Sequence, residues 1–72
     1  MIKICENQID KFKKSYKGYY FSKSGIIFYF NKDKVLIDEV CVYQPIDAYI
    51  NRRINEITTD LIRLGILEVI DD

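Results

Sequence analysis

The sequence predicts one α+β domain spanning residues 1–72. We expect a short N-terminal helix, an antiparallel hairpin or three-stranded meander, a long amphipathic helix and a short C-terminal strand. Residues 45–64 carry a helical apolar stripe, and residues 26–43 read as two β-rich runs around a polar connection. A domain of this size buries only about 60% of its unfolded surface. The 49% hydrophobic content, with only three Gly and one Pro, offsets that weakness.

The first sixteen residues carry two patterns. Residues 1–5 alternate apolar and polar side chains, which is typical of a short strand or of the frayed start of a helix. Apolar residues then recur at spacings of four, three and four, namely Cys5, Ile9, Phe12 and Tyr16. We therefore expect a helix over about residues 5–16 that ends at Gly18, with Asp10 and Lys14 as a helical ion pair.

Residues 19–43 are rich in β-forming side chains. A short strand around residues 19–21 precedes a turn signal at residues 22–25. Residues 26–30 and 35–43 form the strongest hairpin signal, joined by the polar connection of residues 31–34. Asp38 and Glu39 interrupt the second run, either as a bulge or as a charged edge that prevents unwanted strand pairing.

Both predicted hairpin strands are apolar on both faces. A sheet with one wet face should alternate cleanly between apolar and polar residues, and these strands do not. The long helix is expected to cover one face. The short N-terminal helix, a second subunit or a binding partner should cover the other.

One amphipathic helix is expected over Pro45–Leu64. Pro45 suits the first helical position, and Gly65 suits a left-handed stop after the last turn. Ile62 lies off the apolar stripe and is expected to be exposed. Residues 66–70 then read as a terminal strand that could add to a sheet edge beside residues 1–5. The stripe itself has spacings of four, four, three, four and three, and consists of Ile46, Ile50, Ile54, Ile57, Leu61 and Leu64.

Charge and composition restrict the class of protein. The net charge is zero, but residues 1–24 hold six lysines against two acidic residues, whereas residues 25–72 hold five basic against nine acidic residues. That split favours head-to-tail association or attraction of an acidic partner. No apolar run approaches the roughly 18 residues of a membrane span, and no signal-peptide core is present, so we expect a cytoplasmic protein.

Most catalytic constellations are excluded by composition. The chain has no histidine, its three glycines are scattered, and two cysteines cannot form a four-ligand zinc site. We expect Cys5 and Cys41 to be ordinary thiols rather than a disulfide. The sequence therefore predicts a protein that is not an enzyme and that uses no metal and no cofactor.

The leading interpretation is a small non-catalytic protein-binding module that occupies the surface of a partner or forms a homodimer. A bias toward residues with A/T-rich codons is typical of a low-GC bacterium, its phage or an A/T-rich virus. It suggests an accessory protein that inhibits a host factor, such as a defence component. The expected protein interface comprises Tyr49, Arg53, Ile27 and Tyr29. Arg53 is either such an anchor or a stem lying along apolar surface with Asp60 beside it.

The alternative interpretation is a nucleic-acid-binding module. Residues 11–23 interleave lysines, which attract phosphate, with tyrosines, which stack on bases. The same aromatic residues could instead be core, with the lysines keeping that side soluble. The expected nucleic-acid contacts are Lys11, Lys13, Lys14, Lys17 and Tyr19.

Overall fold

Six strands, one 3₁₀-helix and one α-helix make up the part of the chain that the structure describes, which is residues 1–42 and 47–70. The structure is a computed structural model. The side chains of residues 47, 48 and 50 lie outside the described part. The fold class is α+β, as the sequence predicted.

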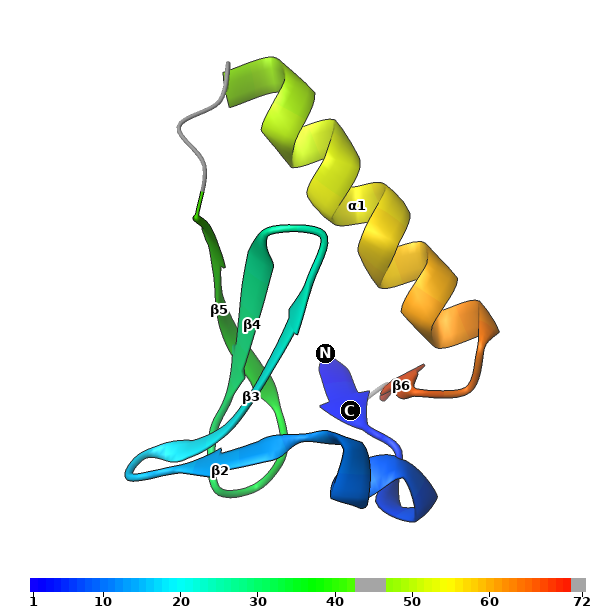
Figure 1. Cartoon of the computed structure of the whole chain (residues 1–72). Coiled ribbons are helices and arrows are strands. Elements are labelled where there is room, and N and C mark those ends of the chain that lie inside the picture. Colours follow the sequence, from blue (N-terminus) through cyan, green and yellow to red (C-terminus); the bar gives the residue numbers. More distant parts are fainter. Residues whose placement is uncertain (43–46, 71–72) are drawn as a thin grey trace.

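An antiparallel meander forms the larger sheet (Figure 1), in the order β2-β3-β4-β5. Ser24 and Gly25 make the two-residue turn between its central strands, with φ values of 53° and 76°. Two left-handed residues in succession match a type I′ turn, whose twist suits a hairpin. The expected choice between a hairpin and a three-stranded meander is resolved as a meander, but with four strands, because residues 13–15 form a strand rather than helix. The strands are β2 (Lys13–Ser15), β3 (Gly18–Lys23), β4 (Ile26–Phe30) and β5 (Leu36–Cys41).

The connection between β4 and β5 is built around Asn31. Its side-chain oxygen accepts hydrogen bonds from the backbone N–H groups of Asp33 and Val35, at 2.9 and 3.1 Å. The register then shifts, because Tyr29 pairs with Asp38 whereas Phe30 pairs with Leu36. The irregularity therefore lies just before Asp38, and β5 is an edge strand of this sheet. Tyr43, the last residue of the predicted strand, lies outside the described residues.

The two ends of the chain form a second, two-stranded sheet. β1 (Ile2–Ile4) and β6 (Leu67–Val69) are antiparallel, with Ile4 opposite Leu67. A single bridge between Lys3 and Val35 joins β1 to the start of β5. The choice left open for residues 1–5 is thus settled as a strand, and the C-terminal strand lies beside it as expected.

The predicted helix over residues 5–16 is wrong in its second half. A 3₁₀-helix covers Glu6–Lys11, and the chain is extended at Phe12 and through β2. Phe12 is buried, with its ring centroid 5.4 Å from those of Phe21 and Phe30. Tyr16, the fourth member of the proposed stripe, is 91% exposed. Aromatic packing across the sheet therefore overrides the helical spacing, and the expected helical pair of Asp10 and Lys14 has no helix to support it.

Gly18 has a different role from the helix end that the sequence suggested. It is buried in β3 at a φ of 152°. A Cβ atom at this position would collide with the carbonyl oxygen of Phe30. The glycine therefore allows two strands to approach closely, which fixes where β2 turns into β3.

The helix α1 extends over Asp47–Arg63 and crosses beside the meander, with β6 and β1 near its C-terminal end (Figure 1). Ile57 and Leu61 are buried and Ile54 is half-buried, which confirms that part of the stripe. Pro45, Ile46 and the side chain of Ile50 lie outside the described part.

The end of α1 reverses two expectations. Gly65 has a φ of 75°, and its N–H bonds to the carbonyl of Ile62 while the N–H of Ile66 bonds to that of Leu61. This paired pattern is a Schellman motif, which turns the chain back sharply. Leu64 lies in this turn and is 61% exposed rather than buried. Ile62, still within α1, packs against the core rather than facing water.

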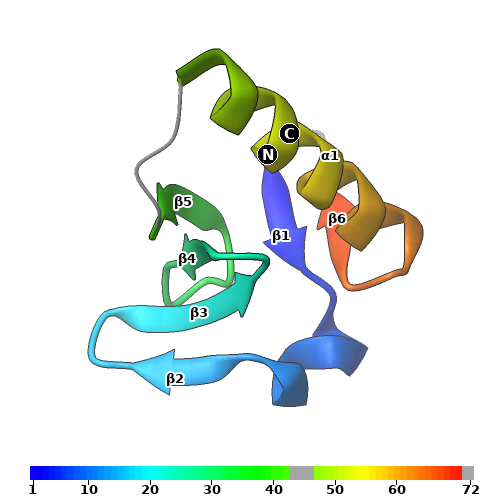
Figure 2. The same ribbon diagram turned by 45° about the horizontal axis from the view of Figure 1, so that its top comes forward.

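The core lies on one side of the meander, between it and the layer formed by α1, β1 and β6 (Figure 2). None of the described helices is long and apolar enough to cross a membrane. The buried apolar residues are Ile4, Phe12, Ile26, Phe28, Phe30, Ile57, Leu61 and Leu67.

Candidate functional site: the open face of the sheet

The meander has one buried face and one accessible face. Along β4, Ile26, Phe28 and Phe30 are at most 2% exposed, whereas Ile27 and Tyr29 between them are only half-buried. Successive side chains of a strand point to opposite faces, so the second set faces away from the core and from α1. We call this surface the open face. By the strand register it comprises Lys13, Tyr20, Ser22, Ile27, Tyr29, Asp38 and Val40, none of which is buried.

One row of the open face crosses all four strands. Lys13 lies opposite Tyr20, Tyr20 opposite Tyr29, and Tyr29 opposite Asp38. The two tyrosine ring centroids are 6.5 Å apart at an interplanar angle of 38°. The ammonium of Lys13 lies 5.9 Å from the Tyr20 ring centroid, within cation–π range. The row therefore has a positive end, an aromatic centre and a negative end.

The neighbouring row is aliphatic. Ser22 lies opposite Ile27, and Ile27 lies opposite Val40, which is 43% exposed. Together with the tyrosines, these side chains form an apolar centre bordered by hydroxyl and charged groups. Such a composition is typical of a surface that contacts another macromolecule.

The structure divides the expected protein interface between two surfaces. Ile27 and Tyr29 lie on the open face. Tyr49 and Arg53 lie exposed on α1, which packs against the opposite face of the sheet. Asp60, which was expected beside Arg53, instead accepts a 2.7 Å bond from Arg63.

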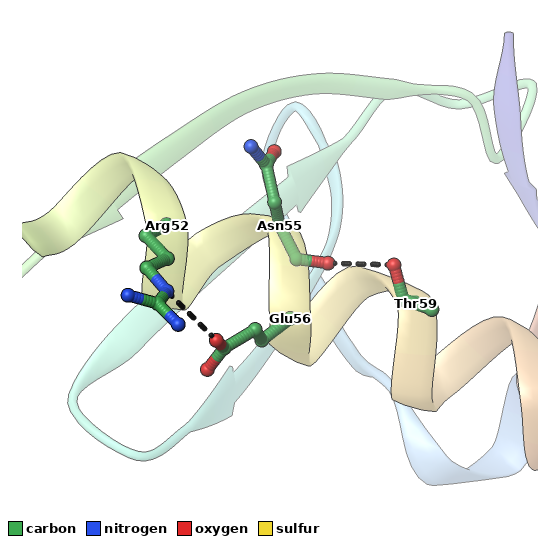
Figure 3. A network of polar contacts seen from close by, with 4 residues as sticks. All are labelled: Arg52, Asn55, Glu56 and Thr59. Atoms are coloured by element: carbon green, nitrogen blue, oxygen red, sulfur yellow. Dashed lines mark hydrogen bonds and ion pairs between the residues drawn. The ribbon is translucent and has the colours of Figure 1, made fainter. Parts of the chain in front are cut away.

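The polar side of α1 is occupied by contacts within the helix (Figure 3). Arg52 and Glu56 form an ion pair at 3.3 Å, and the hydroxyl of Thr59 donates to the carbonyl oxygen of Asn55 at 2.8 Å. The side chains of Arg52 and Glu56 are 82% and 61% exposed. Pairs of this kind contribute little free energy and form no enclosed site.

The expected nucleic-acid contacts fall into separate groups. Lys11 and Lys13 line a shallow depression beside Tyr20, while Lys14 lines a different one with Tyr19 and Lys32. Tyr19 packs against the core, because it shares the inner face with Phe30. Lys17 is exposed in the turn between β2 and β3. Tyr20, rather than Tyr19, is thus the tyrosine that lies beside a lysine, Lys13, on the open face.

Cys5 and Cys41 are half-buried free thiols, and burial together with the carboxylate of Glu68 raises the pKa of Cys5, which lowers its thiolate fraction. Within residues 1–42 and 47–70, no three His, Cys, Asp or Glu side chains are grouped so that they could hold a metal ion.

Sequence reasoning missed Tyr20, Asp38 and Val40 as members of one surface. The signal was present in the turn, because a two-residue loop at Ser24 and Gly25 fixes the pairing of Tyr20 with Tyr29. The position of Asp38 depends on the register shift in β5. The sequence indicated a bulge or a charged edge at Asp38 and Glu39, but not which face Asp38 would take.

Comparison of the chain with protein-family models, with curated proteins and with solved structures gave no significant match.

Proposed function

We propose that this protein is a small non-catalytic module that binds a protein partner through the open face. The observation that carries the proposal is the pair formed by Tyr20 and Tyr29, which stays accessible at the centre of the sheet. Phe28, between Ile27 and Tyr29 on the same strand, is fully buried. The apolar side chains of the open face are therefore surplus to the core, and a bound protein would remove them from water.

The chemistry of the open face suits a protein contact. Tyrosine contributes large contact area with few rotatable bonds and is enriched at interface centres, whereas charged residues are depleted there. Lys13 and Asp38 lie at the border of the apolar centre, where charges favour orientation and association rate over affinity. Inhibition of a larger protein by occupying its surface would require no chemistry beyond this.

The test compares two double variants as bait in an extract of the encoding organism, with bound proteins quantified by mass spectrometry. Tyr29→Ala with Val40→Ser alters the open face, and Tyr49→Ala with Arg53→Ala alters the exposed side of α1. We expect the first pair to lose the partner and the second to keep it. Circular dichroism should show that both variants fold. If only the Tyr49→Ala and Arg53→Ala variant lost the partner, the binding site would lie on α1. If the wild type and both variants captured it equally, neither surface would be the binding site.

A second candidate function is binding of single-stranded nucleic acid. It is favoured by the ammonium of Lys13 over the Tyr20 ring, with Lys11 lining the same depression. Stacking on tyrosine contributes about 1–3 kcal/mol per base. Asp38 weighs against it, because its carboxylate at the other end of the row repels phosphate and leaves the row without net charge.

Fluorescence anisotropy with labelled oligonucleotides tests that second function. It requires binding at about 50 mM salt that weakens steeply as salt rises. It also requires a loss with Tyr20→Ala that Tyr19→Phe does not share, since Tyr19 packs against the core. An oligonucleotide that fails to bind at low salt would end this candidate.

A further inference from the structure

The aromatic row of the open face is self-complementary. Its charges are opposite and lie at its two ends, Lys13 on β2 and Asp38 on β5. Its two tyrosines lie on the central strands, β3 and β4. A two-fold axis parallel to the strands, passing midway between β3 and β4, exchanges the two ends of the row.

We propose that the occupant of the open face is a second copy of this chain, packed face to face about that axis. This inference rests on the proposed function and names its partner. Each Lys13 then lies over Asp38 of the partner subunit, and each Tyr20 lies over Tyr29 of the partner subunit. In the aliphatic row, the same operation places each Ser22 over Ile27 of the partner subunit, because these residues also occupy the two central strands. A two-fold interface requires this kind of self-matching surface.

The spacing of packed sheets accommodates the contact. Two sheets pack about 10 Å apart, which leaves one interdigitated layer of side chains for the tyrosines. Strands about 4.8 Å apart put Lys13 and Asp38 roughly 7 Å on either side of the axis. The strands of two packed sheets usually cross at about 30°. At roughly 7 Å from the axis, that angle shifts Lys13 by about 4 Å relative to Asp38 of the partner subunit, a distance that the flexible lysine side chain can span.

The charge of the whole chain agrees with the arrangement. Residues 1–24, which supply β2 and β3, hold six lysines against Glu6 and Asp10. The rest of the chain, which supplies β5, has an excess of acidic residues. The two-fold operation superposes β2 on β5 of the partner subunit, so Lys13 and Asp38 are the charges of these two parts that meet across the open faces.

The size of the open face sets the expected strength. One strand of three residues and three strands of five or six residues cover on the order of 300 Å² in plan. A stable interface buries about 800 Å² of accessible surface per partner, so this contact belongs at the weak end. We therefore expect a weak, reversible dimer.

The experiment measures self-association of the full chain by analytical ultracentrifugation from about 10 µM to 1 mM in low salt. Lys13→Glu and Asp38→Lys are each expected to raise the dissociation constant at least tenfold, because each opposes like charges twice in the dimer. Lys14→Glu is the matched control, since it makes the same charge change one residue along β2 and its neighbour across the ladder, Tyr19, belongs to the inner face. Lys14→Glu should leave the dissociation constant of the dimer within about twofold of the wild-type value.

An equimolar mixture of the two charge variants provides the decisive readout. In the mixed dimer, the acidic group introduced at position 13 meets the basic group introduced at position 38, while the native Lys13 and Asp38 meet at the other end. The mixture should therefore dimerise at least tenfold more tightly than either variant does alone. A general loss of folding cannot produce this rescue.

Two results would overturn the inference. One is a wild-type chain that stays monomeric up to 1 mM, and the other is a dimer that neither charge variant weakens. If the wild type is monomeric but Tyr29→Ala with Val40→Ser abolishes capture of another protein, only the second-copy inference fails. If those substitutions change neither self-association nor capture, the proposed function fails as well.

Discussion

The backbone N–H of Glu39 donates a 2.8 Å hydrogen bond to the carboxylate of the preceding residue, Asp38. β5 is an edge strand, so its outward N–H groups would otherwise be free to pair with a strand of another molecule. The carboxylate of Asp38 thus occupies the N–H of Glu39 on the free edge of β5, and its negative charge also borders the open face. A carboxylate accepts several hydrogen bonds, so this one leaves capacity for a lysine of the partner subunit.

Replacing Asp38 should separate its two roles. Asp38→Ala removes both the acceptor and the charge, whereas Asp38→Asn removes the charge and keeps an oxygen that can accept the N–H of Glu39. We expect both variants to weaken the face-to-face dimer. Only Asp38→Ala should increase thioflavin T binding and turbidity on incubation, because only it frees the edge donor. Equal aggregation of the two variants would contradict the capping role.

Two leucines of the same segment should respond oppositely to truncation. Leu61 is 1% exposed in the core, so Leu61→Ala should lower the free energy of unfolding by about 2–5 kcal/mol. Leu64 is 61% exposed, so Leu64→Ala should change it by no more than about 0.5 kcal/mol. Urea denaturation followed by circular dichroism measures both values. Similar losses for the two variants would contradict the helix orientation described above.

The two glycines with structural roles should differ in their tolerance of alanine. Gly65 has no atom within 4 Å of an added Cβ, so Gly65→Ala introduces only backbone strain of about 1–2 kcal/mol. At Gly18 the added Cβ meets the backbone of Phe30 and Asn31, which cannot move without disrupting β3 and β4. Thermal unfolding should therefore show a moderate decrease in Tm for Gly65→Ala and a much larger decrease for Gly18→Ala. A tolerated Gly18→Ala would show that the close strand approach is not required.

The free energy of unfolding should depend on pH through the protonation of Glu39. Burial, with the nearby Asp38 carboxylate second, raises the pKa of Glu39 above its ordinary value of 4.5. A raised pKa in the folded state means that folding favours the neutral acid. Its stabilising contribution is complete below pH 4.5 and is lost as the pH rises through the folded-state pKa. Glu39→Gln should therefore be more stable than the wild type in urea at pH 7 and equal to it at pH 3. If Glu39→Gln raised the free energy of unfolding by the same amount at pH 3 and pH 7, the raised pKa of Glu39 would not be the cause.

The elements with strong local signals were predictable from the sequence. The run from Ile26 to Phe30 became β4 without change, and Gly65 ended the long helix in the left-handed conformation. Both depend on preferences that act within a few residues: β-forming side chains between turn signals, and a glycine after a helical stripe. Leu64 is exposed because it lies in the turn at Gly65, which a helical projection does not include. The packing of Ile62 against the core was not indicated by that projection.

The first sixteen residues and the candidate site depended on distant partners. Phe12 leaves the helical pattern because Phe21 and Phe30 offer ring contacts that no nearby residue supplies. The open face likewise requires the register of four strands, including the shift that places Asp38 opposite Tyr29. The residue types for binding were recognised from the sequence, but which of them share a face is a property of strand pairing.

The pairing of β1 with β6 has a consequence for synthesis on the ribosome. Leu67 reaches the core only when β6 pairs with β1, the first strand of the chain. The meander can therefore form early, but its inner face, with Phe28 and Phe30, stays incompletely covered until the last strand has left the exit tunnel. During that interval the nascent chain exposes two apolar faces rather than one, which is when it would be most susceptible to capture by chaperones or to association with neighbouring chains.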